Sequence, residues 1–408
     1  MKKYLFTKYA APILGCIFLS ISGNAQTLGK NSEFKKHTLS TNFKSEGVAT
    51  ADVNKDGKMD VIAGPEWFEA PNWKIHNIYE SKAYNPAKEY CTSFLNITLD
   101  VNFDSWEDLI VVGFPGDPGY WYENPKNKEG HWKKHAFLPE VGIGNESPAF
   151  VDMDGDGRLD ILCTDSKANQ LVWLQAPVSK NDTTWHRYAI SGTDRVHQKF
   201  SHGIGLGDLN KDGRKDIFTK IGWWEAPSNP KQPAWNFHPG TISQDCSQMH
   251  ALDVNSDGLT DVISASAHKL GIWWHQQSKD ANGTITFTTQ KISDLFTQSH
   301  ASSLTDVDGD GHSDLISGKR FFAHNDSNVD PGTHDPAVLY WFKYTPGKTP
   351  WFTPHLVDNN SGAGLQIVVT DMNKDKRTDI AIANKKGVFY FENKMRGKAG
   401  RGKLKTEN

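Results

Sequence analysis

The sequence lacks the long apolar pattern with a period of 3.6 residues that amphipathic helices produce. It has 35 Gly, 14 Trp and frequent Asp-Gly turns among 408 residues, which favours many short strands joined by tight turns. The chain also lacks an excess of basic residues, since its formal net charge is −3. A nucleic-acid partner is therefore not supported.

Cysteine is scarce, with four residues in the chain. Removal of an N-terminal leader would take Cys16 and leave Cys91, Cys163 and Cys246. An odd number of cysteines cannot form a complete set of disulfides, so we expect these three to be buried free thiols.

No hydrophobic run at the N-terminus is long enough to span a membrane. The apolar run at residues 9–21 follows two lysines and precedes small residues that end at Ala25. This pattern predicts a secretory signal over residues 1–25 and export to the periplasm or the extracellular space. Lipid anchoring at Cys16, which lies in a lipoprotein-like cleavage box, is the alternative.

An acidic nine-residue turn occurs seven times, at spacings of 45 to 65 residues. The copies begin at Asp52, Asp100, Asp152, Asp208, Asp253, Asp306 and Asp371. Each turn joins two apolar strands, and an aromatic third strand and a fourth strand follow. Four short antiparallel strands repeated seven times predict an all-β fold, a seven-bladed β-propeller.

The two ends of the repeat region are complementary. Residues 34–40 resemble a fourth strand, whereas the last clear strand of the chain resembles a third strand. Pairing of the N-terminal strand with the C-terminal blade would close the ring, which a straight solenoid would not explain. We expect the propeller to cover residues 34–393 and a basic tail to cover residues 394–408.

The turns and their flanking strands resemble the FG-GAP or VCBS repeats of secreted and integrin-type propellers. This resemblance covers nearly all of the chain after residue 25. It implies the fold, but propellers serve as binding platforms, adhesins and enzymes alike, so the function has to come from the site.

The acidic turns place side-chain oxygens at positions 1, 3, 5 and 9, with glycine after position 5, which suits structural Ca²⁺. The alternative is a turn stabilised by its own backbone hydrogen bonds. Two copies depart from the pattern, because Ser105 and Lys376 replace the glycine. The predicted calcium ligands are Asp52, Asn54, Asp56, Asp60, Asp152, Asp154, Asp156, Asp160, Asp208, Asn210, Asp212, Asp216, Asp253, Asn255, Asp257, Asp261, Asp306, Asp308, Asp310 and Asp314.

The position six residues before each turn should lie on the opposite face of the propeller, near its axis. It holds Glu46, Glu146, His202 and His300 in four of the seven copies, and His250 lies nearby in another. Histidine and glutamate are ligands for Zn²⁺ or a similar divalent ion. We therefore predict a central metal site formed by His202, His250, His300 and Glu146.

The loops between second and third strands should open on the same face. They bring Lys220, His268 and Lys385, and a long excursion after the sixth turn brings Lys319, Arg320 and His324. A loop of that length within an economical repeat is more often functional than idle.

Several phrases are similar to the propeller domain of aldos-2-ulose dehydratases and their bacterial relatives. They are SHGIGLGDLNKDGRKDI, GWWEAP, SQMHALDVNSDG, SAHKLGIWW, SGKRFFAHN and DPGTHDPAVLYWF. Those enzymes eliminate water from keto-sugars, so the resemblance implies a metal-dependent lyase that removes a proton next to a ketone. With it, we assign proton transfer to His268, Lys319 and His324, and substrate contact to Glu46, Lys220, Arg320 and Lys385.

Two alternatives remain open at this point. The same residues could act on an oligosaccharide uronate, where a proton is removed next to a carboxyl group. The chain could also be a non-catalytic propeller that binds glycans or a protein partner. The polar residues near the axis favour the lyase or dehydratase, acting on a carbohydrate.

Overall fold

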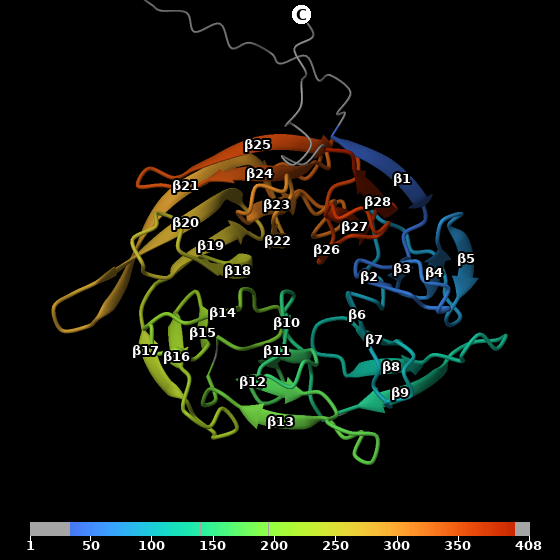
Figure 1. The fold of residues 1–408 in the computed structure, drawn as a ribbon, viewed down its shortest axis with the longest axis horizontal. Coiled ribbons are helices and arrows are strands. Elements are labelled where there is room, and N and C mark those ends of the chain that lie inside the picture. The colour runs from blue at the N-terminus through green and yellow to red at the C-terminus, as the bar shows by residue number, and fades with distance from the viewer. Residues whose placement is uncertain (1–32, 139, 195, 396–408) are drawn as a thin grey trace, which may run out of the picture. The chain divides into compact units, whose positions relative to one another are not determined.

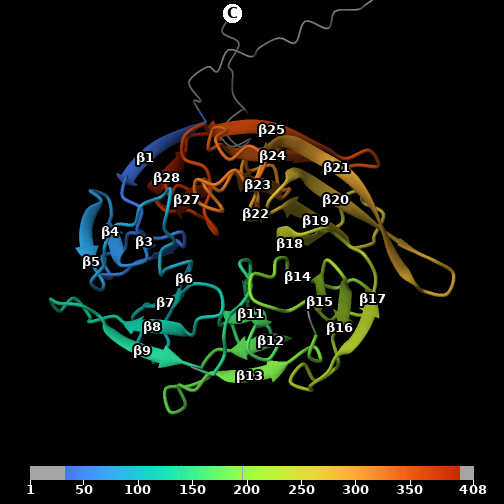
Figure 2. The ribbon, with the colours of Figure 1, turned by 180° about the vertical axis from the view of Figure 1, so that it is seen from behind.

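The computed structural model describes residues 33–138, 140–194 and 196–395, all within one compact unit. Every regular element in these residues is a β-strand, and the sheets form a ring around a central axis (Figure 1, Figure 2). The predicted all-β propeller is thus confirmed. The predicted signal segment, Cys16 and nearly all of the basic tail lie outside the described residues.

Five separate four-stranded antiparallel sheets form blades of the propeller. The first blade consists of β2 (Ala49–Ala51), β3 (Asp60–Ala63), β4 (Glu66–Glu69) and β5 (Lys74–Asn77). The second consists of β6 (Leu95–Leu99), β7 (Asp108–Val112), β8 (Gly119–Glu123) and β9 (Lys133–Phe137). The third consists of β10 (Ala149–Val151), β11 (Asp160–Asp165), β12 (Gln170–Gln175) and β13 (His186–Ala189). The other two consist of β22 (Ala301–Thr305), β23 (Asp314–Gly318), β24 (Leu339–Thr345) and β25 (Trp351–Asp358); and β26 (Ile367–Thr370), β27 (Asp379–Asn384), β28 (Gly387–Asn393) and β1 (Phe34–Ser40).

The remaining strands form one eight-stranded sheet. It contains β14 (Gly205–Gly207), β15 (Asp216–Thr219), β16 (Gly222–Glu225), β17 (Asn236–Pro239), β18 (Cys246–Leu252), β19 (Asp261–Ser266), β20 (Leu270–Lys279) and β21 (Ile285–Thr297). The innermost strands β14 and β18 pair in parallel, so two four-strand repeats share a sheet.

The expected count of seven separate blades is therefore wrong, because five are separate and two repeats are merged. Glycine explains the merging. A Cβ on Gly207 would lie 2.4 Å from the Cβ of Ala251 in β18, so only glycine permits this approach.

The predicted closure of the ring is confirmed. Strand β1 pairs antiparallel with β28, from Phe34 opposite Asn393 to Ser40 opposite Val388. In Figure 1 the blue β1 accordingly lies beside the red β28. The N-terminal strand thus supplies the fourth strand of the C-terminal blade.

The aspartate at the ninth turn position connects the strands of each blade. Asp60 is fully buried and accepts backbone N–H bonds from Val53 at 3.0 Å and from Ala70 at 2.8 Å. Burial raises the pKa of Asp60 to about 7. This carboxylate therefore holds the turn against the end of the third strand.

Aromatic residues fill the space around the blades. Trp173 and Trp341 are among the largest fully buried side chains. On the outer strands, His238 stacks on Trp223 with ring centroids 4.0 Å apart, and its Nε2 lies 2.9 Å from Glu225. This pairing packs the fourth strand of a blade onto the third.

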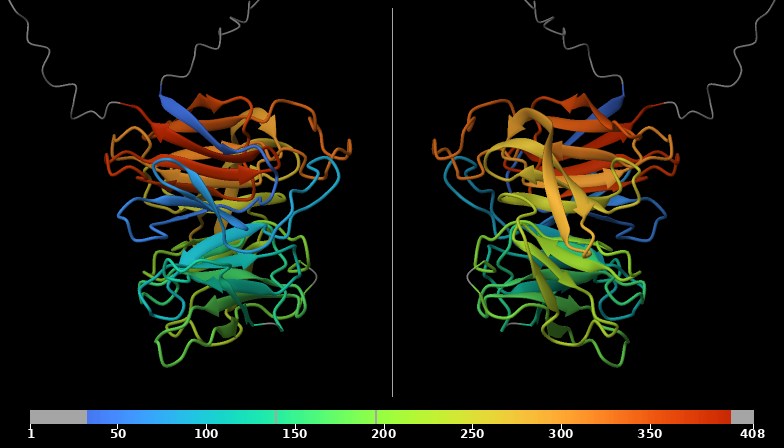
Figure 3. Two further views of the ribbon diagram at one scale, coloured as in Figure 1. Left: turned by 90° about the vertical axis from the view of Figure 1, so that its right-hand side faces the viewer. Right: turned by 90° about the vertical axis from the view of Figure 1, so that its left-hand side faces the viewer.

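Two irregular segments lie side by side on one face of the ring (Figure 3). One is the excursion 319–338 between β23 and β24, and the other connects β5 to β6. The Asp326 N–H donates to the Ala87 carbonyl at 2.9 Å, and the Tyr90 hydroxyl donates to the Ala323 carbonyl at 3.0 Å. These contacts build one wall of the candidate site.

The three cysteines of the described part are free and buried, as expected. Within the same residues, no helix reaches the length and apolar character that a membrane crossing requires.

Candidate metal centre and ligand pocket

Three histidines from three consecutive repeats converge near the axis. His202 precedes β14, His268 lies in the turn between β19 and β20, and His300 precedes β22. Each offers one ring nitrogen, and the three nitrogens lie within 4.8 Å of one another. We call His202, His268 and His300 the histidine trio.

The histidine trio is suited to hold a metal ion because its members are neutral at neutral pH. Burial lowers the pKa of all three, to about 4 for His268 and well below the ordinary value for His300, which is 1% exposed. Nε2 of His202 and Nε2 of His300 have no hydrogen-bond partner. Neutral imidazoles with unpaired nitrogens fit Zn²⁺ or a similar divalent ion.

A buried ion network lies beside the trio. Nε and Nη2 of Arg320 each donate to the Glu46 carboxylate at 2.7 Å, and Nη1 donates to Glu146 Oε2 at 2.8 Å. The same Glu146 oxygen lies 4.0 Å from Nε2 of His300. Burial alone would raise the pKa of Glu146, but the Arg320 guanidinium brings it below its ordinary value.

This network brings Glu46, Glu146 and Arg320 together close to His300, while the predicted metal binding by Glu146 and substrate contact by Glu46 and Arg320 stay predictions. Both carboxylate oxygens of Glu46 are occupied by hydrogen bonds from Arg320. Glu46 is completely buried, whereas Arg320 and Glu146 line a pocket.

That pocket has a volume of about 420 Å³ and adjoins the trio. We call it the aromatic pocket, since Tyr90, Phe94, Phe114 and Phe200 line it. The ring centroid of Phe114 lies 5.7 Å from that of Tyr90, 5.4 Å from Phe94 and 5.5 Å from Phe200. An aromatic wall with a few convergent polar groups is typical of ligand sites.

His324 also lines the aromatic pocket. Its Nδ1 lies 2.8 Å from Oδ2 of Asp330, and its ring stacks on His268 with centroids 4.7 Å apart. Donation of Nδ1–H to Asp330 leaves a lone pair on Nε2 of the half-exposed His324 ring. His324 is thus arranged to accept a proton from a bound ligand.

Two of the three lysines predicted on the axis face have partners in the excursion 319–338. Lys319 is fully buried and donates to the carbonyl oxygens of Gly332 and of Thr333, the latter at 3.2 Å. Lys385 donates to Asn325 Oδ1 at 2.7 Å, and burial lowers its pKa to about 8. Neither lysine lines the aromatic pocket, so both brace the excursion 319–338.

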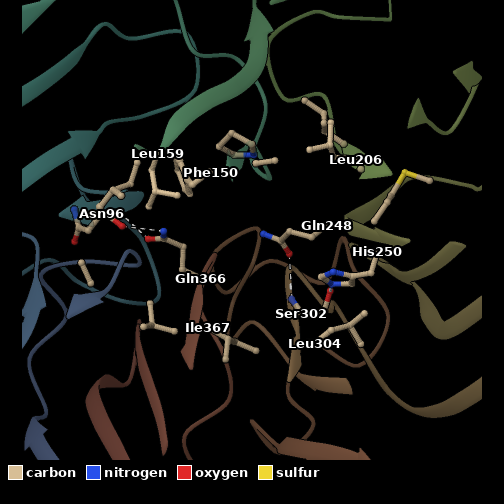
Figure 4. A pocket seen from close by; sticks show the side chains of 18 of the residues that line it. Asn96, Phe150, Leu159, Leu206, Gln248, His250, Ser302, Leu304, Gln366 and Ile367 are labelled. Atoms are coloured by element: carbon tan, nitrogen blue, oxygen red, sulfur yellow. Dashed lines mark hydrogen bonds between the residues drawn. The ribbon is translucent and has the colours of Figure 1, made fainter. Parts of the chain in front are cut away.

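His250 is not brought into the trio. It lines a separate axial pocket of about 620 Å³, where its Nε2 lies 2.9 Å from Oγ of Ser302 (Figure 4). Because His250 lies three residues before its turn and not six, β18 carries it deeper along the axis than His300. His268, predicted to transfer protons, takes the place expected for His250 in the histidine cluster.

Several pocket residues were missed in the sequence. Tyr90 and Phe114 lie in irregular segments without a repeat signature, and Asp245 pairs with Lys220 at the edge of the pocket. Asp330 could have been found, since it lies six residues after His324 in the long excursion.

The aspartate side chains of the acidic turns accept hydrogen bonds from the backbone of the same turn, which is the predicted alternative to calcium binding. Oδ2 of Asp208, for example, accepts the Gly213 N–H at 2.9 Å. Ser105 and Lys376 adopt positive φ angles of 71° and 65°, close to the 87° of Gly213. The two copies without glycine at this position therefore adopt the same turn conformation as the other copies.

Two turns gather three aspartate oxygens within 4.8 Å of one another. They are Asp152, Asp154 and Asp160 in the third copy, and Asp306, Asp308 and Asp314 in the sixth. In the sixth copy Lys343 donates to Asp308 and Asp310, which already neutralises part of the charge. In the third copy Lys231 lies 3.6 Å from Asp154 and donates no hydrogen bond to it, so its charge is neutralised less closely. Calcium binding stays a prediction, and the third copy is its best candidate.

Comparison with known proteins agrees with the repeat assignment. A family model described as "FG-GAP-like repeat" matches residues 100–163, 152–219 and 253–317. Integrin alpha pat-2 of Caenorhabditis elegans is 27% identical over 260 residues, which is 50% of this chain and 21% of that protein. The chain thus spans about a fifth of this relative's length.

Solved structures with related arrangements have low identity. A BBS1N–ARL6DN complex gives a TM-score of 0.47 at 10% identity, covering 88% of this chain and 96% of that chain. A mutant of AofleA from Arthrobotrys oligospora gives 0.38 at 12% identity, covering 80% and 90%. The V. cholerae biofilm matrix protein Bap1 gives 0.29 at 15% identity, covering 88% and 42%. None of these matches points to aldos-2-ulose dehydratases.

Proposed function

We propose that the chain is an exported, metal-dependent lyase that removes a proton next to a carbonyl group of a saccharide and expels an oxygen substituent. The convergence of three neutral histidines at the edge of a pocket that also holds the His324–Asp330 pair supports this function. The leader-like N-terminus supports export.

In this proposal the histidine trio would hold a divalent ion, which would supply Lewis-acid stabilisation of the negative charge that develops on the substrate oxygen. Nε2 of His324 accepts the proton from the carbon next to the carbonyl, and the electron pair of that C–H bond forms a C=C bond. The C–O bond to the leaving group breaks, and the leaving oxygen takes the proton back from His324. The products are an unsaturated sugar and water or an alcohol.

The surrounding residues orient this reaction. Asp330 is 7% exposed and stabilises the imidazolium that His324 becomes. The aromatic pocket offers ring faces against which the C–H face of a sugar can pack. Arg320 holds Glu146 so that its carboxylate lies 4.0 Å from Nε2 of His300, which places a negative charge beside the trio.

A non-catalytic propeller that binds glycans or a protein is the second candidate. The FG-GAP-like repeats and the match to an integrin alpha chain support it, because neither of these matches is to an enzyme. Under this function the aromatic pocket would hold a sugar without reaction.

Metal analysis tests the first candidate. Purified protein incubated with Zn²⁺ and desalted should retain about one equivalent per chain, and a His202→Ala His300→Ala variant should lose it. His250→Ala is the matched control, since this histidine lies in a separate pocket. Absence of bound zinc in the wild type would overturn the metal centre.

Turnover separates the two functions. Keto-sugars and acidic oligosaccharides should yield the ultraviolet absorbance of an unsaturated product. If zinc is retained but no saccharide reacts while a glycan array shows binding, the non-catalytic function is the correct one.

A further inference from the structure

A second pocket lies on the other side of His202. It has a volume of about 300 Å³ and shares Phe200, His202 and Asp245 with the aromatic pocket. We call it the basic pocket, because Lys199 and Lys220 line it. A ligand bound at the histidine trio could therefore extend past His202 into this second space.

The basic pocket carries an excess of positive charge. Lys220 forms an ion pair with Asp245, the only carboxylate among the described lining residues. Nζ of Lys199 lies 4.9 Å from the ring centroid of Phe114 and 5.1 Å from that of Phe200. In the described part of the chain no carboxylate lies within ion-pair distance of Lys199, so its ammonium group is available to an anion.

The wall of the basic pocket also contains an unsatisfied buried nitrogen. His197 is 2% exposed, and its Nδ1 lies 2.6 Å from Oδ2 of Asp194. The other oxygen of this carboxylate, Oδ1, accepts the backbone N–H of His197 at 2.9 Å. Nε2 of His197 has no hydrogen-bond partner. Burial lowers the pKa of His197, which favours a neutral ring with Nε2 as an acceptor.

An acceptor left unpaired in a buried wall is costly, and a ligand hydroxyl can satisfy it. The pocket thus combines ammonium groups for an anion with an acceptor for a hydroxyl. A sugar unit that carries an acidic group offers both partners.

We propose that the basic pocket is a second subsite that binds the anionic group, a carboxylate or a sulfate, of the sugar unit next to the one held at the metal centre. The ligand class is then an acidic oligosaccharide of at least two units. This inference rests on the proposed function, in that the aromatic pocket is the site of the first unit.

Binding of defined disaccharides tests the subsite. Isothermal titration would compare a diuronate, a neutral disaccharide of the same linkage and a sulfated disaccharide, with wild type and with a Lys199→Gln Lys220→Gln variant. We expect the variant to bind the acidic disaccharide at least about tenfold more weakly and the neutral one unchanged. The sulfated and uronate arms identify which anion is preferred.

A Lys128→Gln Lys279→Gln variant is the matched control, because both lysines are exposed and line neither pocket. His197→Leu should weaken both disaccharides about equally, whereas His197→Gln, which keeps an acceptor, should restore part of the binding. Equal affinity of wild type for acidic and neutral disaccharides, or unchanged binding by the double lysine variant, would overturn the subsite.

Zinc content is measured in the same samples. If the double lysine variant retains zinc but binds the acidic disaccharide more weakly, the subsite is supported. If it retains zinc and binds the acidic disaccharide as tightly as the wild type does, the subsite is rejected. A wild type without zinc that still prefers the diuronate in a lysine-dependent way would reject the metal centre while keeping the anionic subsite.

Discussion

Glu146 accepts a hydrogen bond from Arg320 at 2.8 Å through the same carboxylate oxygen that lies 4.0 Å from Nε2 of His300. One carboxylate therefore connects the buried arginine to the histidine trio. Because Arg320 also holds Glu46, three repeats meet through a single guanidinium group.

Removal of one carboxylate from this network should destabilise the protein less than removal of the arginine. Glu146→Gln leaves Arg320 paired with Glu46, whereas Arg320→Met leaves two buried carboxylates without a cation. We expect unfolding free energies to fall by about 1–2 kcal/mol for the first and about 3–5 kcal/mol for the second. Denaturant titration measures both, and an inverted order would show that the network is not held by Arg320.

The same Glu146→Gln variant should weaken zinc binding by about 10-fold to 100-fold, because it removes a carboxylate charge that lies 4.0 Å from Nε2 of His300. Zinc titration with a competing chelator measures this change. His250→Ala, in its separate pocket, should leave the zinc affinity unaltered.

Zinc binding should resist acid. A histidine with an ordinary pKa near 6.5 loses metal as the pH falls below that value, whereas burial lowers the pKa of His268 to about 4. We expect the affinity to change little between pH 7 and about 5, and to fall steeply towards pH 4. A zinc titration series across this range would reject the prediction if the affinity already dropped around pH 6.5.

Calcium should stabilise the protein more at pH 7 than at pH 5. Burial raises the pKa of Asp160 to about 6, so the folded state binds more protons than the unfolded state between about pH 4 and 6. Stability from this group is present below about pH 4 and is lost as the pH rises through 6, and a bound cation offsets that loss. Thermal unfolding with calcium or with chelator, at both pH values, measures the difference.

The third and sixth turns should differ in this experiment. Asp154→Asn should reduce the calcium-dependent rise in Tm more than Asp308→Asn does, because the Lys343 ammonium donates directly to Asp308, whereas the Lys231 ammonium lies 3.6 Å from Asp154. Equal effects of the two variants would contradict this assignment.

Lys376→Gly should stabilise the seventh turn by about 1 kcal/mol, because Lys376 has a φ of 65° where five other copies have glycine. Lys215→Gly is the control. It lies in a turn position without positive φ, so the added backbone freedom should destabilise by about 0.5–1 kcal/mol. Denaturant midpoints measure both, and stabilisation by the control variant would show that strain is not the cause.

The sequence predicted the elements that repeat and missed those that do not. Strand alternation and the position before each turn placed Glu146, His202 and His300 together, because equivalent strands start at the same distance from the axis. The merging of β14 with β18 depends on the contact between Gly207 and Ala251, which no local pattern reveals.

The loop residues could not be assigned in the same way. Lys319 and His324 follow β23 in one excursion, yet the first points into the loop carbonyls and the second lines the pocket. That difference arises from the path of the excursion against residues 87–90, a contact between segments far apart in the chain.

His324→Ala should abolish turnover without loss of zinc, if an active saccharide is found. His324 lies outside the histidine trio but faces the same pocket, and with His268 and Asp330 it forms a second group of possible metal ligands. If the metal is held by the trio, as proposed, removal of Nε2 of His324 removes the proton acceptor and leaves the metal ligands in place, whereas loss of zinc in this variant would assign the metal to the second group. We expect a decrease in kcat of about 100-fold to 10,000-fold, with partial rescue by added imidazole. His334→Ala is the matched control, since this exposed histidine of the same excursion pairs with Asp326 and does not line the pocket. Full activity of His324→Ala would remove His324 from the reaction, whereas equal losses in both variants would point to a general disturbance of the excursion.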